Sequence, residues 1–207
     1  TNIIPGRYEI KPSMTYVELM EDIFEGNLQQ FRFTIIEGTV AKDALRKLRQ
    51  IIKNNNLNFQ ISSKTLEIFS KESLILPDTY FFTDRQQLER LMINQKIRLD
   101  NILTRLWKNK PKDNPLKSIN EALILASIVE REAAVEWERA QISSVFLSRI
   151  RDGWRLDADP TLIYGYYGDF SKKITKENLK AVKGDNNPFN TYKIKGLPPR
   201  PICYPSL

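Results

Sequence analysis

Two glutamates, Glu130 and Glu132, follow an uncharged run, Leu123 to Val129, in the stretch LILASIVEREAAVEWER. If residues 119–135 form a helix, the neighbours of Glu130 three, four or seven positions away are uncharged and mostly small. They are Leu123, Ala126, Ser127, Ala133, Ala134 and Trp137. The side of Glu132 carries bulkier aliphatic residues and Arg139. A carboxyl on an apolar, partly desolvated face has a raised pKa, which suits a general acid. Glu130 is therefore our first candidate.

A simpler interpretation is that the charges at 130–132 mark where a buried helix emerges into water, and periodicity alone favours it. Asp157 and Asp159, in RLDADPT, are candidates for a second carboxylate. A two-carboxylate glycosidase needs such a partner roughly 5 to 10 Å away. Residues 159–161 equally read as a turn in which Asp precedes Pro.

Composition restricts the available chemistry. The 207 residues include no histidine and one cysteine, Cys203. The absence of histidine excludes Ser-His and Cys-His catalysis and histidine-ligated metals, and a single cysteine excludes an internal disulfide and a thiolate zinc cluster. Catalysis must therefore use carboxylates, hydroxyls, Lys or Arg, and we expect no cofactor or metal.

The net charge of +7 favours a polyanionic partner such as nucleic acid, anionic lipid or an acidic wall polymer. The 32 Lys and Arg are scattered among 25 acidic residues, however, whereas a nucleic-acid binder needs one contiguous basic face. We therefore predict no nucleic-acid partner.

Periodicity predicts an α+β chain. Helical patterns cover 15–25, 41–56, 62–72, 85–110, 118–134 and 136–153, and strand patterns cover 8–10 and 29–40. The three aromatic residues at 80–82 read as a packed loop. After Gly153 the tail is rich in Pro, Gly, Asn and Tyr, and we expect it to be loop-rich and to contain β-structure. No apolar run approaches the roughly 18 to 20 residues of a membrane span. The start, TNIIPGRYEI, resembles an interior cut that leaves room for an anchor upstream.

Several motifs together resemble one family. LASIVEREA, SVFLSRIRDGWRLDADPTLIYG and NPFNTYKIKGLPPRPI are similar to segments of the MltG (YceG-like) endolytic murein transglycosylase family. ESLILPDTYFF resembles its EG-x-L-x-PDTY segment, with Ser73 where Gly is usual, and GRYEIKPSMTYVELMEDI resembles its LysM-like subdomain. The resemblance implies a small LysM-like N-terminal subdomain over 1–70. A mainly helical YceG-like catalytic domain of lysozyme-like function would follow over 71–207.

The resemblance also implies an activity. Family members cleave the MurNAc-GlcNAc β-1,4 bond of nascent glycan strands and leave 1,6-anhydro-MurNAc ends. The first Glu of the motif, here Glu130, would protonate the glycosidic oxygen and then accept the proton of the sugar's own 6-hydroxyl. Glu132 and Arg149 would support the site. The implied substrate-binding residues are Ser127, Asp159, Thr161, Tyr164, Asn190 and Tyr192.

The family is anchored in the bacterial cytoplasmic membrane, with its catalytic part on the outer face. The resemblance therefore implies an anchor outside this chain, and as partners peptidoglycan strands and wall-synthesis enzymes such as penicillin-binding proteins. The family pattern continues beyond PGxxSL with a YLYFV segment and a histidine-containing motif, so we expect a catalytic domain truncated at Leu207. Tyr204 stands where the family commonly has Gly.

The alternative function is a non-catalytic peptidoglycan-binding module. The two hypotheses differ in the surroundings of Glu130. An enzyme would present Glu130 in an open groove, whereas a binding module would hold it in a salt bridge with Arg131 or Arg139.

Overall fold

The computed structural model describes residues 3–175, 182 and 184–206. Within these residues the chain has seven helices and one two-stranded sheet, so the predicted α+β class is confirmed. The elements are α1 (Tyr16–Glu25), β1 (Phe31–Thr34), α2 (Ala41–Asn54), α3 (Ser63–Ile68), β2 (Thr79–Phe82), α4 (Arg85–Lys108), α5 (Ile119–Glu132), α6 (Glu138–Arg151) and α7 (Asp159–Tyr167). None of the described helices is long and apolar enough to cross a membrane.

The sheet pairs β1 with β2 in antiparallel register, with Phe31 opposite Phe82 and Thr34 opposite Thr79. The prediction of an aromatic loop at 80–82 is wrong, because these residues form most of β2. Tyr80 and Phe82 are buried while Phe81 is exposed, which is the two-residue period of a strand with one buried face. Residues 8–10, predicted as a strand, have no regular secondary structure.

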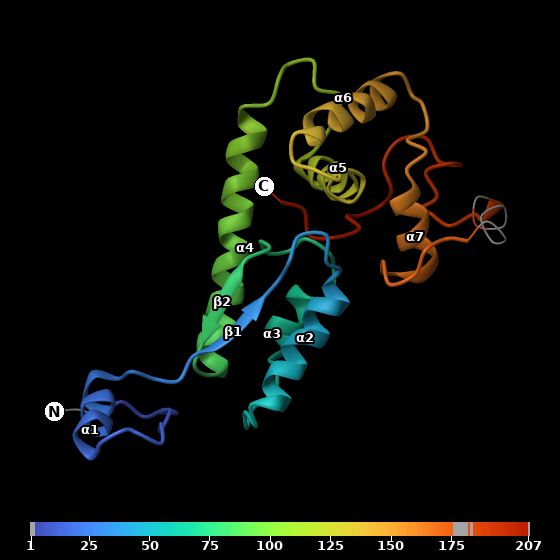
Figure 1. Ribbon diagram of the computed structural model, residues 1–207. Coiled ribbons are helices and arrows are strands. Elements are labelled where there is room, and N and C mark those ends of the chain that lie inside the picture. The colour runs from blue at the N-terminus through green and yellow to red at the C-terminus, as the bar shows by residue number, and fades with distance from the viewer. Residues whose placement is uncertain (1–2, 176–181, 183, 207) are drawn as a thin grey trace.

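A first hydrophobic core forms on the buried face of this sheet. Phe33 and Phe82 pack there with Leu48 of α2 and with Leu88 and Met92 of α4. The chain thus runs β-α-α-β and then into α4, and Figure 1 shows α2 and α3 side by side near the two strands. The core continues past residue 70, the predicted end of the N-terminal subdomain.

Residues 3–28, which include α1, form a small lobe at the N-terminal end of the molecule (Figure 1). Thr15 and Glu18 close a capping box at the start of α1, and Gly26 ends the helix in the left-handed region at φ 76°. No residue of α1 is buried. The LysM-like character of the N-terminal part remains a prediction.

A second core surrounds α5, which packs against α4, α6 and α7. Ile124, Leu125, Ile128 and Val129 are buried, so α5 is enclosed on most sides, and Figure 1 shows it seen along its axis beneath α6. The predicted turn at 159–161 is wrong, because these residues are the first turn of α7, where the fixed φ of proline suits a helix start. The described residues beyond α7 contain no strand, so the predicted β-structure in the tail is wrong for them.

A segment that we call the strap, residues 202–206, joins the two cores. The Gly38 N–H donates to the Tyr204 carbonyl at 2.8 Å, and the Tyr204 N–H donates to the Thr39 carbonyl at 2.9 Å. On its other side the Ile202 N–H donates to Ser127 Oγ of α5 at 3.0 Å. The strap thereby fixes α5 relative to the loop between β1 and α2.

Glu72 lies in the seam between the two cores, where the strap also runs. It accepts hydrogen bonds from the Ala41 N–H, at the start of α2, and from the Tyr164 hydroxyl of α7, the latter at 3.0 Å. Burial raises the pKa of this carboxyl to about 7, against the lowering effect of both hydrogen bonds. A single titratable side chain therefore connects elements of both cores.

We expect Phe82→Ala to lower the free energy of unfolding by about 3 to 5 kcal/mol, because the ring is fully buried and its removal leaves a cavity. The matched control is Phe81→Ala on the same strand, where the side chain is 49% exposed and the expected change is within about 0.5 kcal/mol. Urea unfolding measures both. Equal losses would contradict the strand alternation.

We expect Glu72 to make stability depend on pH. Its folded pKa lies above the ordinary glutamate value of 4.5, so its contribution is complete below pH 4.5 and is lost as the pH rises to about 7. The loss amounts to roughly 3 kcal/mol. Unfolding of the wild type and Glu72→Gln between pH 4 and 8 should show the wild type losing stability relative to the variant. Glu67→Gln, at an exposed position of α3, serves as the control, and a pH-independent difference for Glu72→Gln would refute this prediction.

Candidate active site

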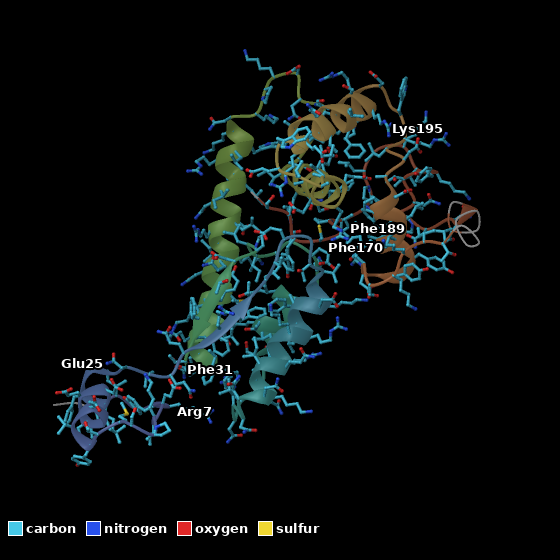
Figure 2. All side chains as sticks on the ribbon, in the orientation of Figure 1. Arg7, Glu25, Phe31, Phe170, Phe189 and Lys195 are labelled. Atoms are coloured by element: carbon cyan, nitrogen blue, oxygen red, sulfur yellow. The ribbon has the colours of Figure 1, made fainter. Side chains whose placement is uncertain are left out.

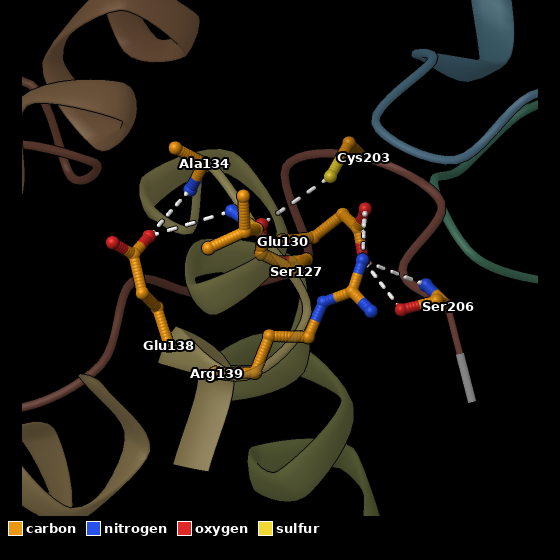
Figure 3. Close-up of polar contacts among 8 residues, drawn as sticks. Ser127, Glu130, Ala134, Glu138, Arg139, Cys203 and Ser206 are labelled. Carbon is orange, nitrogen blue, oxygen red and sulfur yellow. Dashed lines mark hydrogen bonds and ion pairs between the residues drawn. The ribbon is translucent and has the colours of Figure 1, made fainter. Parts of the chain in front are cut away.

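Glu130 is held on both of its carboxylate oxygens. Arg139 of α6 approaches Oε1 at 3.3 Å, and the Ser206 N–H and hydroxyl donate to Oε2 at 2.9 and 2.7 Å. Figure 3 shows the side chain between these two partners, and only 9% of it is exposed. Glu130 therefore has the ion pair that the binding-module alternative requires.

The helix ends two residues after Glu130. Ala133 is the C-cap of α5, so the residues at 133–137 that a continuous helix would place beside Glu130 belong to the connection to α6. Glu138 fixes this connection by accepting a hydrogen bond from the Ala134 N–H at 3.0 Å (Figure 3). The expected face of small residues exists only toward the N-terminal end of α5.

On that face a mainly apolar groove of about 300 Å³ runs between α4 and α5. Trp107 of α4, Leu123 and Ala126 of α5, and Ser206 of the strap are among its lining residues. Because Ser206 also binds Glu130, this carboxylate lies near one end of the groove. It does not have an oxygen free of hydrogen bonds to offer a ligand there.

Glu132 has different surroundings. Its side chain is accessible to solvent, and no hydrogen bond or ion pair to it is present among the described residues. Desolvation by the surrounding protein raises the pKa of the Glu132 carboxyl, the charge of Asp159 raises it further, and Arg149 opposes both. Glu132 is thus an accessible carboxyl poised to carry a proton at a higher pH than an ordinary glutamate.

The acidic neighbour of Glu132 is itself fixed. Asp159 is the first residue of α7, and its Oδ1 accepts a hydrogen bond from the Tyr192 hydroxyl at 2.7 Å. Burial and then this hydrogen bond hold the pKa of Tyr192 well above its usual value. Arg149 is anchored through the Leu156 carbonyl. We call Glu132, Arg149, Asp159 and Tyr192 the carboxylate cluster.

The other predicted substrate-binding residues are buried, and their role as ligand contacts stays a prediction. They are Ser127, Thr161, Tyr164 and Asn190. Ser127 Oγ donates its one hydrogen to the Ile124 carbonyl and accepts from the Ile202 N–H of the strap.

Of the remaining three, Thr161 and Tyr164 tie α7 to other segments, and Asn190 fixes the tail segment before Tyr192. Thr161 and Thr191 share a hydrogen bond of 2.8 Å between their hydroxyls, and Tyr164 binds Glu72. Asn190 donates to the Asp185 carbonyl at 2.7 Å and accepts from the Tyr192 N–H at 3.1 Å. These contacts fix the segments that carry Asp159 and Tyr192.

Two residues of the seam were not identified from the sequence. Glu72 meets Tyr164 across 92 positions of the chain and Ser206 meets Glu130 across 76, and no local pattern signals such a pairing. The only available signal was the position of each inside a motif. No group of three or more Cys, Asp or Glu side chains among residues 3–175, 182 and 184–206 is placed to hold a metal ion.

Comparison with known proteins defines the class. The sequence model of the YceG-like family matches residues 1–207, and the chain belongs to this family. A crystal structure of a YceG-like protein from Listeria monocytogenes has the same fold, with a TM-score of 0.61 and 24% identity. That alignment covers 96% of this chain and 71% of the Listeria chain.

Two curated relatives are endolytic murein transglycosylases. The one from Bacillus subtilis (strain 168) is 26% identical over 221 residues, which is 96% of this chain and 60% of the relative. The one from Streptococcus pneumoniae serotype 2 (strain D39 / NCTC 7466) is 30% identical over 142 residues, 66% of this chain and 24% of the relative. The chain therefore spans about 60% of the length of the first of these relatives.

We expect Ser127→Ala to destabilise the fold by about 1 to 3 kcal/mol, because the buried Ile202 N–H loses its acceptor. The matched control is Ser144→Ala on α6, whose hydroxyl makes the same type of bond to the carbonyl three residues back but is exposed. Thermal or urea unfolding measures both variants. Weaker glycan binding by Ser127→Ala at unchanged stability would support its predicted role as a ligand contact.

Proposed function

We propose that this chain carries the catalytic site of a peptidoglycan lytic transglycosylase. The proposed reaction cleaves the MurNAc-GlcNAc β-1,4 bond and leaves a 1,6-anhydro-MurNAc end. One observation carries the proposal: an accessible carboxyl with a raised pKa, Glu132, lies at the end of α5 beside the Asp159–Tyr192 pair. The names of the curated relatives supply the substrate class.

Two carboxylates compete for the role of general acid. The resemblance in the sequence selects Glu130, whereas the geometry favours Glu132. A general acid must point a proton at the leaving oxygen, and Glu130 has three donors directed at its two oxygens. Glu132 has no such partner among the described residues and carries the raised pKa. We therefore propose Glu132 as the acid and Glu130 as the residue that fixes the strap to α5.

The proposed chemistry needs one proton and no water. Glu132 protonates the glycosidic oxygen as the bond to C1 of MurNAc breaks, and the GlcNAc hydroxyl leaves. The resulting carboxylate accepts the proton of the 6-hydroxyl as that oxygen attacks C1 and closes the anhydro ring. Because the nucleophile is tethered to the reacting sugar, proximity replaces the second carboxylate and the water of a hydrolase. The negative charge of Asp159 favours both the protonated acid and the positive charge that develops at C1.

The cellular setting is also a proposal. The family resemblance supports nascent glycan strands as the substrate, wall-synthesis enzymes such as penicillin-binding proteins as partners, and the outer face of the bacterial cytoplasmic membrane as the location. The Glu130–Arg139 ion pair supports one alternative function, a non-catalytic peptidoglycan-binding module.

We expect Glu132→Gln to reduce cleavage of purified glycan strands about 100- to 10,000-fold, because the general acid is lost. Glu130→Gln should keep activity within about 10-fold of the wild type and lower stability, since it weakens the contact with Ser206. Glu136→Gln, at an exposed position just beyond α5, is the charge-matched control. Mass spectrometry of the products identifies anhydro ends.

The outcomes separate the hypotheses. Loss of anhydro products in Glu130→Gln, with Glu132→Gln active, would establish Glu130 as the acid. Reducing-end fragments would establish a hydrolase and would assign Asp159 a direct role in activating water. Glycan binding without cleavage by the wild type would favour the binding module.

A further inference from the structure

A basic groove of about 540 Å³ adjoins the carboxylate cluster. It lies between the C-terminal end of α6 and the tail segment that follows Tyr192. The lining residues are Arg149, Gly153, Trp154, Arg155, Asp157, Lys193 and Lys195. Arg149 belongs to both the groove and the cluster, and the charge of Asp157 acts on Tyr192. A ligand in the groove would therefore extend away from the proposed catalytic centre.

The groove has an exposed aromatic side chain, that of Trp154, on a fixed backbone. Trp154 is 63% exposed, although its backbone is fixed by hydrogen bonds from its N–H to the Arg149 carbonyl and from the Gly196 N–H to its carbonyl, at 2.8 and 3.4 Å. Asp157 has a φ of 50°, a left-handed conformation that non-glycine residues rarely adopt. Its N–H is bound to the Thr191 carbonyl. Exposed aromatic rings on fixed backbones are typical of binding surfaces.

The groove has more positive than negative side chains. Two of the positive side chains make no hydrogen bond or ion pair with the described residues. Lys193 is anchored by the Gly184 carbonyl and by Asn186 Oδ1, and Arg149 by the Leu156 carbonyl. Arg155 and Lys195 are exposed and make no hydrogen bond or ion pair with the rest of the described chain. Figure 2 shows Lys195 at the outer edge of the part of the molecule that contains α6 and α7. Two fixed and two free cations thus surround one carboxylate, Asp157.

We propose that this groove binds the stem peptides of a glycan strand through their carboxylates, while Trp154 packs against the strand. The inference rests on the proposed function and names a substrate feature for the same site. The repeating sugars of a peptide-bearing strand are neutral, so its fixed negative charges lie in the peptides, whose terminal carboxylates suit Arg and Lys. A free amine in the same peptide would pair with Asp157. A polyphosphate chain has no amine to offer Asp157 and could pair with the cations of the groove alone.

The test measures binding to three soluble glycan oligomers of equal length by titration calorimetry. One carries stem peptides with free carboxylates, one carries the same peptides with amidated carboxylates, and one carries no peptide. We expect the full chain to bind the first about 10-fold more tightly than the others at low salt. The preference should shrink as salt rises, because exposed charges are screened.

The variant Arg155→Gln/Lys195→Gln should lose this preference and bind all three oligomers alike. The matched control, Arg105→Gln/Lys108→Gln, removes the same charge from exposed positions of α4 and should keep it. Trp154→Ala should weaken binding to all three oligomers without abolishing the preference. Because all five positions are exposed, thermal unfolding should be unchanged.

Equal affinity for the three oligomers, or equal loss in the groove variant and the α4 control, would overturn the proposal. Tighter binding of a glycerol phosphate polymer than of the peptide-bearing oligomer would also overturn it. A parallel digest separates this inference from the proposed function. Carboxylate-dependent binding without anhydro products would support the groove and refute the enzyme. Anhydro products without any carboxylate preference would support the enzyme and refute the groove.

Discussion

The arrangement of the whole molecule depends on the strap between its two cores. Tyr204 is fully buried in the first core, while its neighbours Ile202 and Cys203 are buried in the second. The backbone of the strap pairs with the loop between β1 and α2 on one side and with Ser127 on the other. The Tyr204 hydroxyl finds no partner among the described residues, so packing of the ring must offset that desolvation. Ser127 and Glu130 of α5 bond to the strap, and the strap in turn bonds to the loop between β1 and α2.

The strap also contributes to the different surroundings of Glu130 and Glu132. Residues two apart on a helix point to different sides, so the last turn of α5 directs Glu130 and Glu132 into different surroundings. The strap and Arg139 enclose Glu130 with donors. The side of Glu132 is left to α7, which contributes Asp159, and to the tail, which contributes Tyr192. A contact that stabilises the fold on one side of α5 thus leaves a titratable carboxyl accessible on the other.

Local patterns in the sequence predicted most helices, because their caps and apolar stripes are encoded within a few residues, as Ser118 and Gly26 illustrate. They missed β2, since a strand of only four residues is too short for its two-residue alternation to be distinguished from a loop. The periodicity argument for Glu130 depended on residues 133–137 continuing the helix, and the capping of α5 at Ala133 removed that argument, whereas the family resemblance is unaffected by it. Pairings such as Glu130 with Ser206 span 76 positions, so only the folded chain reveals them.

The contacts of Asp159 also bear on the class of reaction. The Tyr192 hydroxyl occupies one of its oxygens, which makes Asp159 a fixed source of negative charge more than a mobile base. Such a charge raises the pKa of a neighbouring acid and stabilises an oxocarbenium ion, and neither effect requires a bound water. Such a fixed charge is consistent with the proposed mechanism, in which the substrate supplies its own nucleophile.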